Sequence, residues 1–216
     1  MPASYRALLA EIDAWFRSVQ ARHGAQMKCG SGCSDCCHGV FDIGPHDVAL
    51  VREAYRALPP ETRALVRAEA QRQVDAMGLK PPYELEGMAE ETIDALAEKP
   101  GPVACPLLDP DGRCRIYADR PSTCRFMGLP LVDAEEGVVH AEWCFRNFEG
   151  TDALKLPGLA FGYHSWEGDV DALPISSTPH TTFIACAILA EFENKSDRDA
   201  PSDAPGFPQD AELPRK

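Results

Sequence analysis

The sequence has no apolar run of about 18 residues, and positively charged side chains are scarce in it. The first absence excludes a membrane-spanning helix. Arg6, Glu11 and Asp13 interrupt the apolar residues near the amino terminus, so we expect no secretory leader and a cytoplasmic protein. Lysine and arginine number 21 against 34 aspartate and glutamate, a net charge of -13. Because this charge repels phosphate backbones and anionic lipid, we expect neither nucleic acid nor membrane as a partner.

Several catalytic motifs are also missing. The six histidines show no H-x3-H or H-E-x-x-H spacing, so the sequence contains no catalytic zinc motif of those kinds. There is no G-x-S-x-G elbow for a serine nucleophile, and no glycine-rich loop after a strand that would hold S-adenosylmethionine. The sequence therefore lacks these common catalytic motifs, but an enzymatic activity of another kind stays open.

The sequence instead has 9 cysteines, and four of them fall within nine residues. These four are Cys29, Cys33, Cys36 and Cys37, and a second set follows much later at Cys105, Cys114, Cys124 and Cys144. An odd count and an ordinary hydrophobic fraction of 44% disfavour a disulfide scaffold. We expect one cysteine-built metal centre, closed by two distant segments. The ninth cysteine, Cys186, lies between apolar neighbours and is expected in the core.

The spacing of the cysteines bears on the kind of metal. Thiolates are soft ligands that favour iron-sulfur clusters, zinc and cuprous copper. The first set reads C-x3-C-x2-C-C, and because successive side chains point apart, one of Cys36 and Cys37 is expected to serve a second metal atom or the core. Gaps of eight, nine and nineteen residues in the second set differ from the short paired knuckles of zinc sites. We therefore predict an iron-sulfur cluster, [4Fe-4S], with zinc as the alternative.

Other residues near the cysteines admit two interpretations each. Arg120 and Arg125 flank Cys124 and are candidates to stabilise an anionic cluster, or else each forms an ordinary ion pair. Cys144 would complete the second set of four, but it also suits the core. His38 and His46 lie close to the first cysteines and suit either the metal's surroundings or the surface.

Apolar residues at helical spacing predict a mainly α fold. We expect helices over residues 4–23, 45–58, 61–77, 85–99 and 182–193, and a short helix after Pro121. Turn signals predict one or two short β-hairpins, over residues 103–117 and 129–140, whereas residues 150–180 are expected to be irregular. The helices would surround an irregular cysteine-rich metal-binding core, residues 29–144. We expect one domain over residues 1–194 and a disordered tail over residues 195–216.

Four blocks of this sequence together resemble the YkgJ-type cysteine-cluster proteins. The blocks are Cys33-Ser34-Asp35-Cys36-Cys37, Cys105-Pro106-Leu107-Leu108, Cys114-Arg115-Ile116-Tyr117 and Arg120-Pro121-Ser122-Thr123-Cys124-Arg125. The resemblance covers residues 29–144 and implies a zinc- or iron-chelating, iron-sulfur-cluster-containing domain. The family often separates its first two cysteines by two residues, whereas Cys29 and Cys33 are separated by three. A related cysteine cluster occurs in flagellin lysine N-methylases, but the loop for their methyl donor is not found here.

These observations support three functional hypotheses. The first is a cytoplasmic protein that holds an iron-sulfur cluster or iron for electron transfer, iron handling or support of a modification reaction, with a redox or other protein partner. The second is a structural zinc module that scaffolds a protein partner. The third is a metal-dependent modification enzyme, which would need an open coordination position on its metal.

Overall fold

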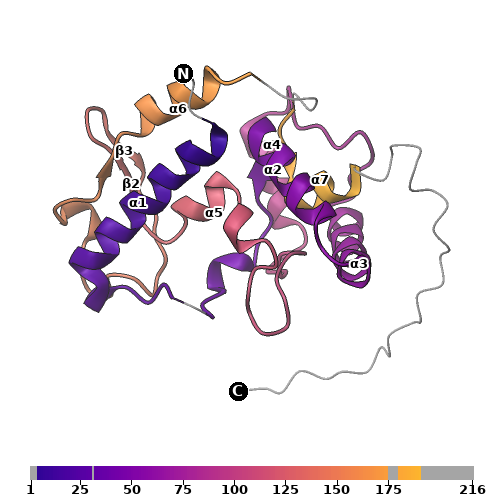
Figure 1. The fold of residues 1–216 in the computed structure, drawn as a ribbon, viewed down its shortest axis with the longest axis horizontal. Helices are drawn as coiled ribbons and strands as arrows, with labels where there is room; N and C mark the ends of the chain where they lie inside the picture. The colour runs from indigo at the N-terminus through magenta and orange to yellow at the C-terminus, as the bar shows by residue number, and fades with distance from the viewer. Residues whose placement is uncertain (1–3, 31, 175–179, 191–216) are drawn as a thin grey trace.

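The structure, a computed structural model, describes residues 4–30, 32–174 and 180–190 (Figure 1). Within these residues the chain forms seven α-helices and five short strands. The helices are α1 (Tyr5–His23), α2 (Pro45–Arg56), α3 (Pro60–Met77), α4 (Glu90–Glu98), α5 (Ser122–Phe126), α6 (Tyr163–Asp171) and α7 (Ile184–Ala190). The strands are β1 (Asp42–Ile43), β2 (Leu131–Asp133), β3 (Gly137–His140), β4 (Ala160–Phe161) and β5 (Thr182–Phe183). The predicted mainly α fold is confirmed.

Helix α1 begins and packs as its sequence predicts. The Ser4 side chain accepts a hydrogen bond from the Ala7 amide at 3.3 Å and so caps the first turn. Buried residues recur at helical spacing along one face, namely Leu8, Leu9, Ile12, Trp15 and Val19. This face forms one of two hydrophobic clusters, together with Leu129, Phe148 and Trp166. The indole nitrogens of Trp15 and Trp166 donate to Leu159 O and Leu8 O, each at 2.9 Å, so both buried tryptophans have partners.

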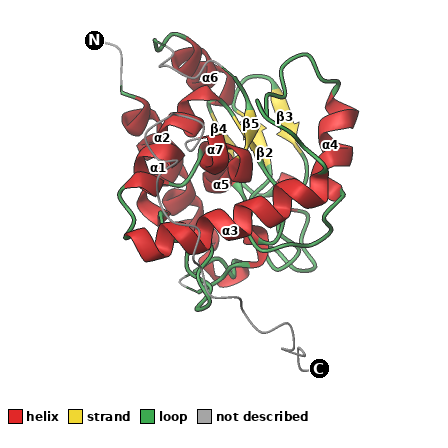
Figure 2. Ribbon diagram, turned by 90° about the vertical axis from the view of Figure 1, so that its right-hand side faces the viewer, coloured by secondary structure: helices red, strands yellow, loops and turns green. Residues whose placement is uncertain are grey.

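The second hydrophobic cluster joins α2, α3 and α7. Val51 and Tyr55 of α2, with Val74 of α3, pack around the fully buried Cys186 and Ile188 of α7. Figures 1 and 2 both show α3 and α7 side by side. The core role predicted for Cys186 is therefore confirmed. In Figure 1, α1, α6 and strands β2 and β3 lie on one side, α2, α3, α4 and α7 on the other, and α5 lies between them.

Two small sheets connect distant parts of the chain. Strand β1 pairs antiparallel with β5, and β2 pairs antiparallel with β3 and parallel with β4. The β2–β3 hairpin lies within the predicted hairpin over residues 129–140. The other predicted hairpin is reduced to an isolated bridge between Leu108 and Cys114, because the Cys105 amide bonds instead to the Cys37 carbonyl. One of the two expected hairpins is thus confirmed.

Two predicted boundaries are wrong. Residues 150–180 were expected to be irregular, yet α6 forms there, because Tyr163, Trp166 and Val170 recur at helical spacing and pack toward α1. The helix expected from residue 85 begins only at Glu90, since the Leu85 amide donates to Thr181 O and Gly87 takes a φ of +78°.

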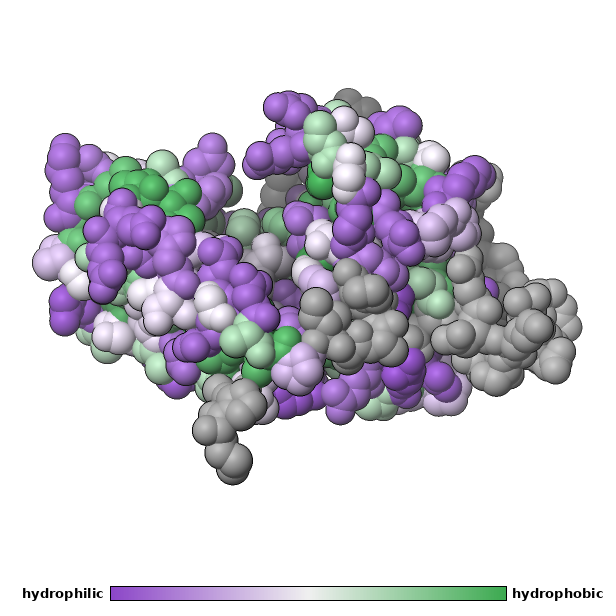
Figure 3. Space-filling view, turned by 90° about the horizontal axis from the view of Figure 1, so that it is seen from above, coloured by the Kyte–Doolittle hydropathy of each residue, from purple (hydrophilic) through white to green (hydrophobic). Residues whose placement is uncertain are grey.

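The surface is mostly hydrophilic on the face that Figure 3 shows, and the outline of the molecule in this view is notched between two projecting parts. No helix in the described part of the chain is long and apolar enough to cross a membrane. The predicted tail, residues 195–216, lies outside the described residues, and the single domain over residues 1–194 stays a prediction.

Candidate metal centre

The segment before and within the first cysteine set is held by residues that follow Cys144. The Phe148 amide donates to Gln26 O at 2.7 Å, and the Lys28 amide donates to Asn147 Oδ1 at 2.8 Å. Arg146 forms an ion pair with Asp35 at 2.7 Å. Because these contacts span more than a hundred residues of sequence, the two segments are brought together by the tertiary fold. Cys144 is consequently a neighbour of the early cysteines, although its sequence position had grouped it with the second set.

The second set reaches the first segment from the other side. The Cys105 amide donates to the Cys37 carbonyl at 2.7 Å. A methyl group added at Gly112 would lie 3.4 Å from Ser34 Oγ, so the turn between Cys105 and Cys114 rests on the early segment. The predicted approach of the early segment by later parts of the chain is therefore present in the structure.

Helix α5 carries Cys124 and is anchored at its first residue by a buried carboxylate. Asp47 of α2 accepts hydrogen bonds from the Ser122 amide at 3.0 Å, the Ser122 hydroxyl at 2.7 Å and the Tyr5 hydroxyl at 2.6 Å. Burial raises the pKa of Asp47, while these donors lower it. One side chain thus links α1, α2 and α5 and fixes the position of Cys124.

Cys29, Cys33 and Cys144 form the first group of neighbouring thiols. Burial raises the pKa of the Cys29 thiol, a hydrogen bond from Asn147 lowers it, and charges on Cys144, Cys33 and Cys36 raise it again. Charges on Cys33 and Cys144 also raise the pKa of Arg146, after the larger effect of its pairing with Asp35. These thiols are therefore close enough for their charges to interact, although they come from two remote segments.

Asn147 and Gly128 shape the surroundings of Cys29, and no sequence motif marked either residue. The Asn147 side-chain amide donates to Cys29 Sγ at 3.2 Å and to Gly128 O at 2.7 Å, and the residue is 1% exposed. Gly128 has a φ of +102°, and a methyl group there would lie 3.0 Å from Cys29 Sγ. Donors to sulfur stabilise a thiolate, so Asn147 favours the form of Cys29 that binds metal.

Cys37, Cys105, Cys114 and Cys124 form the second group. Burial raises the pKa of Cys105 to about 12 and raises that of Cys124 well above its ordinary value, and each thiol also feels the charge of Cys114. A hydrogen bond with Cys36 lowers the pKa of Cys37, whereas burial and the charges of the other three members raise it. Thiols whose charges reach one another in this way suit a soft metal, which displaces their protons on binding.

Cys36 lies between the two groups. Its hydrogen bond with Cys37 is the largest of the effects that raise its pKa, followed by burial. Its charge is felt by Cys29 in the first group and by Cys105 and Cys124 in the second. The Cys36 and Cys37 thiols thus hydrogen-bond to each other, and the expectation that they serve different places stays a prediction.

The two predicted arginines are both paired with Asp13 of α1. Arg120 forms an ion pair with Asp13 at 3.0 Å and lies over the Tyr117 ring, 4.2 Å from its centroid. Its charge also lowers the pKa of Cys114, against the larger effect of burial. Arg125, whose side chain is 5% exposed, pairs with Asp13 and donates to Ala118 O at 2.7 Å and Arg120 O at 3.0 Å. Both arginines thus form ion pairs, and a role of either one in stabilising an anionic cluster stays a prediction.

The described residues do not include three Cys, His, Asp or Glu side chains already grouped to hold one metal ion. Metal ligation would therefore require the neighbouring thiols to turn toward a common point. His38 is exposed and has its ring nitrogen 2.9 Å from Ser34 O, and His46 stacks near the Tyr5 ring. The assignment of Cys29, Cys33, Cys36, Cys37, Cys105, Cys114, Cys124 and Cys144 as ligands stays a prediction, and the chemistry of these donors fits it.

Comparison with known proteins identifies the same stretch of chain. A family model, CxxCxxCC, described as a "Putative zinc- or iron-chelating domain", matches residues 28–145, more than half of the chain. The match begins one residue before Cys29 and ends one residue after Cys144. No curated protein and no solved structure matches the chain.

Proposed function

This chain belongs to the CxxCxxCC family of zinc- or iron-chelating domains, and from that premise we propose that eight thiols hold its metal in two groups of four. The second group already has four members, Cys37, Cys105, Cys114 and Cys124. Cys36 completes the first group, beside Cys29, Cys33 and Cys144. Its place there is supported by the cavity wall that it shares with Cys144 and by its interaction with Cys29.

Each group is proposed to hold an iron-sulfur cluster, [4Fe-4S], whose ordinary ligands are four cysteine thiolates. A tetrahedral zinc ion with four thiolates satisfies the same ligand count. The spacing favours the cluster, since the second group draws its members from widely separated positions. When bound, such clusters supply one-electron redox chemistry, and this chain's residues would surround them with buried thiols and the Asn147 donor.

Electron transfer is the function that this arrangement supports best. The observation that carries it is that Cys36 and Cys37 are consecutive and have members of both groups as neighbours. The charge of Cys36 acts on Cys29, and the charges of Cys105, Cys114 and Cys124 act on Cys37. We assign the two cysteines to different groups. Consecutive Cα atoms are about 3.8 Å apart, so two centres bridged in this way would lie close enough to exchange an electron. The redox partner is proposed to be another cytoplasmic protein, in a compartment whose reducing conditions keep thiols free.

A structural zinc module that scaffolds a protein partner is the second candidate. It is favoured by apolar side chains exposed close to Cys144 in sequence, with Phe145 81% exposed and Val138 55% exposed. Exposed apolar side chains of this size often mark contact surfaces.

Anaerobic purification of the full chain distinguishes these functions. The cluster hypothesis predicts a brown protein with broad visible absorption, acid-labile sulfide in equal amount to iron, and bleaching on reduction by dithionite. A colourless protein with bound zinc and no sulfide would support the scaffold. A protein purified with neither metal, and binding neither when iron with sulfide or zinc is supplied, would contradict both.

A further inference from the structure

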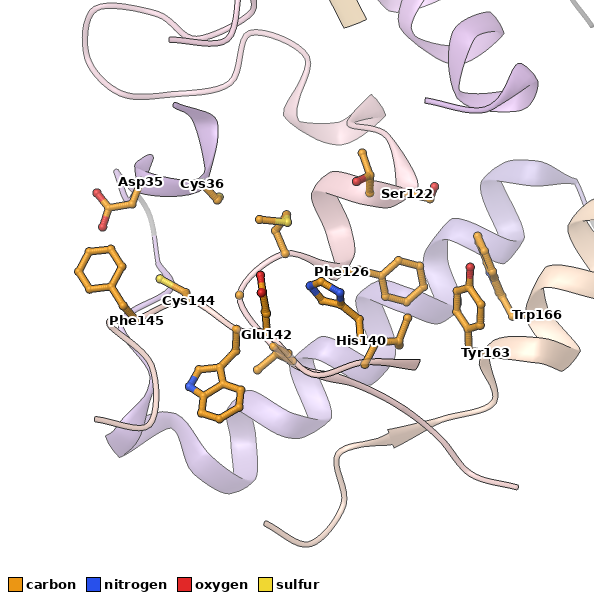
Figure 4. Close-up of a pocket in the computed structure, with 16 residues that line it drawn as sticks. Asp35, Cys36, Ser122, Phe126, His140, Glu142, Cys144, Phe145, Tyr163 and Trp166 are labelled. Atoms are coloured by element: carbon orange, nitrogen blue, oxygen red, sulfur yellow. The ribbon is translucent and has the colours of Figure 1, made fainter. Parts of the chain in front are cut away.

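A cavity of about 600 Å³ opens beside the first thiol group. Cys36 and Cys144 line one end of it, and Phe126, Tyr163 and Trp166 line the other (Figure 4). The wall at this second end is held by ring packing, since Phe126 lies edge-on to Trp166 at 5.5 Å and to Tyr163 at 5.9 Å. A volume of this size accommodates a small organic molecule.

The middle of the cavity carries a carboxylate. Figure 4 shows Glu142 and His140 between the cysteine end and the aromatic end. Glu142 is exposed, and no described residue forms a hydrogen bond or ion pair with it. Asp35 also lines the cavity, but its charge is paired with Arg146. Lysine and arginine are absent from the residues that line this cavity.

We propose that this cavity binds an organic cation, an alkylammonium group carried on a short apolar body. Aromatic faces attract a cation through their ring quadrupole, and Phe126, Trp143, Tyr163 and Trp166 supply such rings. Glu142 supplies a negative charge that has no competing partner among the described residues. Phosphorylated ligands and carboxylates are disfavoured, because Glu142 would repel their negative charge and no lysine or arginine lines the cavity to compensate.

The cation would lie beside Glu142 in the middle of the cavity, between the aromatic end and the first thiol group. Its attraction to the aromatic rings and to Glu142 is independent of any metal. A further attraction rests on the proposed function, because a metal centre with four thiolates carries a net negative charge. Binding would then place the ligand next to a redox centre, so the cavity is a candidate substrate or effector site of that same centre.

Isothermal titration calorimetry on the full-length, metal-loaded chain tests the proposal with choline and with n-butylammonium. The uncharged probe 3,3-dimethyl-1-butanol has the shape of choline without its charge, and butyrate is the anionic control. We expect saturable binding of at least one cation, at least about tenfold tighter than the uncharged probe, a ratio that corresponds to about 1.4 kcal/mol. Comparison of the two cations shows whether the site takes a quaternary or a primary ammonium group.

Two variants locate the binding site. Glu142→Gln keeps the shape of the side chain and should weaken cation binding about tenfold while leaving the uncharged probe unaffected. Glu149→Gln removes a charge from an exposed residue that does not line the cavity, and should leave cation binding unchanged. Trp143→Leu should weaken cation binding by removing an aromatic face.

Several results would overturn the proposal. These are no saturable binding of either cation, equal binding of choline and its uncharged counterpart, tighter binding of butyrate, or equal effects of the Glu142 and Glu149 substitutions. Iron, zinc and sulfide are measured in the same samples. A sample with full metal and no cation binding refutes the cavity proposal alone, whereas cation binding by a chain that takes up neither iron with sulfide nor zinc refutes only the proposed metal centre.

Discussion

Cys29 has the most specific surroundings of the eight candidate ligands. A buried amide donates to its sulfur, and a methyl group added at Gly128, which has a positive φ, would lie 3.0 Å from it. Neither the Asn147 amide nor Gly128 adds an apolar side chain to the hydrophobic core. Both instead orient one thiol and favour its ionised form, which is the form that binds metal.

Replacement of Asn147 with Asp tests the donor to sulfur. Asp keeps the shape and the acceptor for the Lys28 amide, but it removes both N–H donors and adds a charge beside Cys29. We expect the metal affinity of the first group to fall about 10- to 100-fold, as measured by competition with a chelator. Gln20→Glu is the control, because Gln20 donates to the Cys29 carbonyl from an exposed position. Equal affinities in the two variants would show that Asn147 does not support the site.

Gly128→Ala tests the close approach of backbone to sulfur. The added methyl group would meet Cys29 Sγ at 3.0 Å in a backbone conformation that alanine rarely adopts. We expect a loss of about 1–3 kcal/mol in the free energy of unfolding, and reduced metal retention. Gly150→Ala has a similar positive φ of +71° but open space around it, so it should lose stability and keep its metal. Metal loss in both variants, or in neither, would argue against a specific contact with Cys29.

At the scale of elements, the site depends on short helices and turns that are fixed by polar side chains. Helix α5 has only five residues, so its own backbone hydrogen bonds hold it weakly. Asp47 anchors its first residue, and Asp13 of α1 pairs with Arg120 and Arg125 around it. The position of Cys124 therefore follows from carboxylates that lie far away in sequence.

Asp13→Ala should destabilise the fold by about 3 kcal/mol, because it leaves the buried guanidinium of Arg125 without its anion. The free energy of unfolding from urea denaturation measures this loss. Glu11→Ala changes an exposed carboxylate on the same helix and should shift the stability by less than about 0.5 kcal/mol. A similar small shift for Asp13→Ala would mean that the two arginines are held by other contacts.

Asp133 links the β2–β3 turn to α6. Its carboxylate accepts hydrogen bonds from the amides of Glu135, Glu136 and His164, which lower its pKa from 3.8 to about 2. A lowered pKa in the folded state stabilises the protein above the ordinary pKa, and this contribution is lost as the pH falls from about 4 to about 2. The free energy of unfolding of Asp133→Asn should therefore fall less steeply over that interval than that of the unaltered chain, as followed by circular dichroism in urea.

Asp169→Asn, on the exposed face of α6, is the control and should keep the pH dependence of the unaltered chain. The same pH dependence in all three proteins would refute the proposed contribution of Asp133 to stability.

At the scale of the whole molecule, the sequence predicted that the early and late cysteine segments approach each other, but it did not predict which cysteines are neighbours. That Cys36 and Cys37 serve different places was expected from their adjacency in sequence and stays a prediction. By contrast, Cys144 was counted with the later cysteines, because nothing local shows that residues 146–148 bond back to residues 26–35. Asn147 was not identified from the sequence for the same reason, since only the tertiary fold brings its side-chain amide to the Cys29 sulfur. Helix α6 was missed although its apolar spacing was present, because glycine and acidic residues masked it.

The charge of the molecule agrees with the proposed chemistry only in part. A net charge of -13 disfavours anionic ligands generally, whereas binding of anionic metal centres requires local compensation. The fold supplies some of it through Arg120, whose charge reaches Cys114, and through Asn147 at Cys29. The cavity beside the first group receives no such cation among its lining residues, which is why its ligand is expected to be positive.

Metal stoichiometry in three single variants tests the central claim of two four-thiol groups most directly. Iron, zinc and sulfide are measured per chain in Cys33→Ser, Cys114→Ser and Cys186→Ser, each purified without oxygen. We predict that Cys33→Ser and Cys114→Ser each retain about half of the metal of the unaltered chain, and that Cys186→Ser, altered in the apolar core, retains all of it. Full metal in both of the first two variants, or complete loss of metal in either one, would contradict the account.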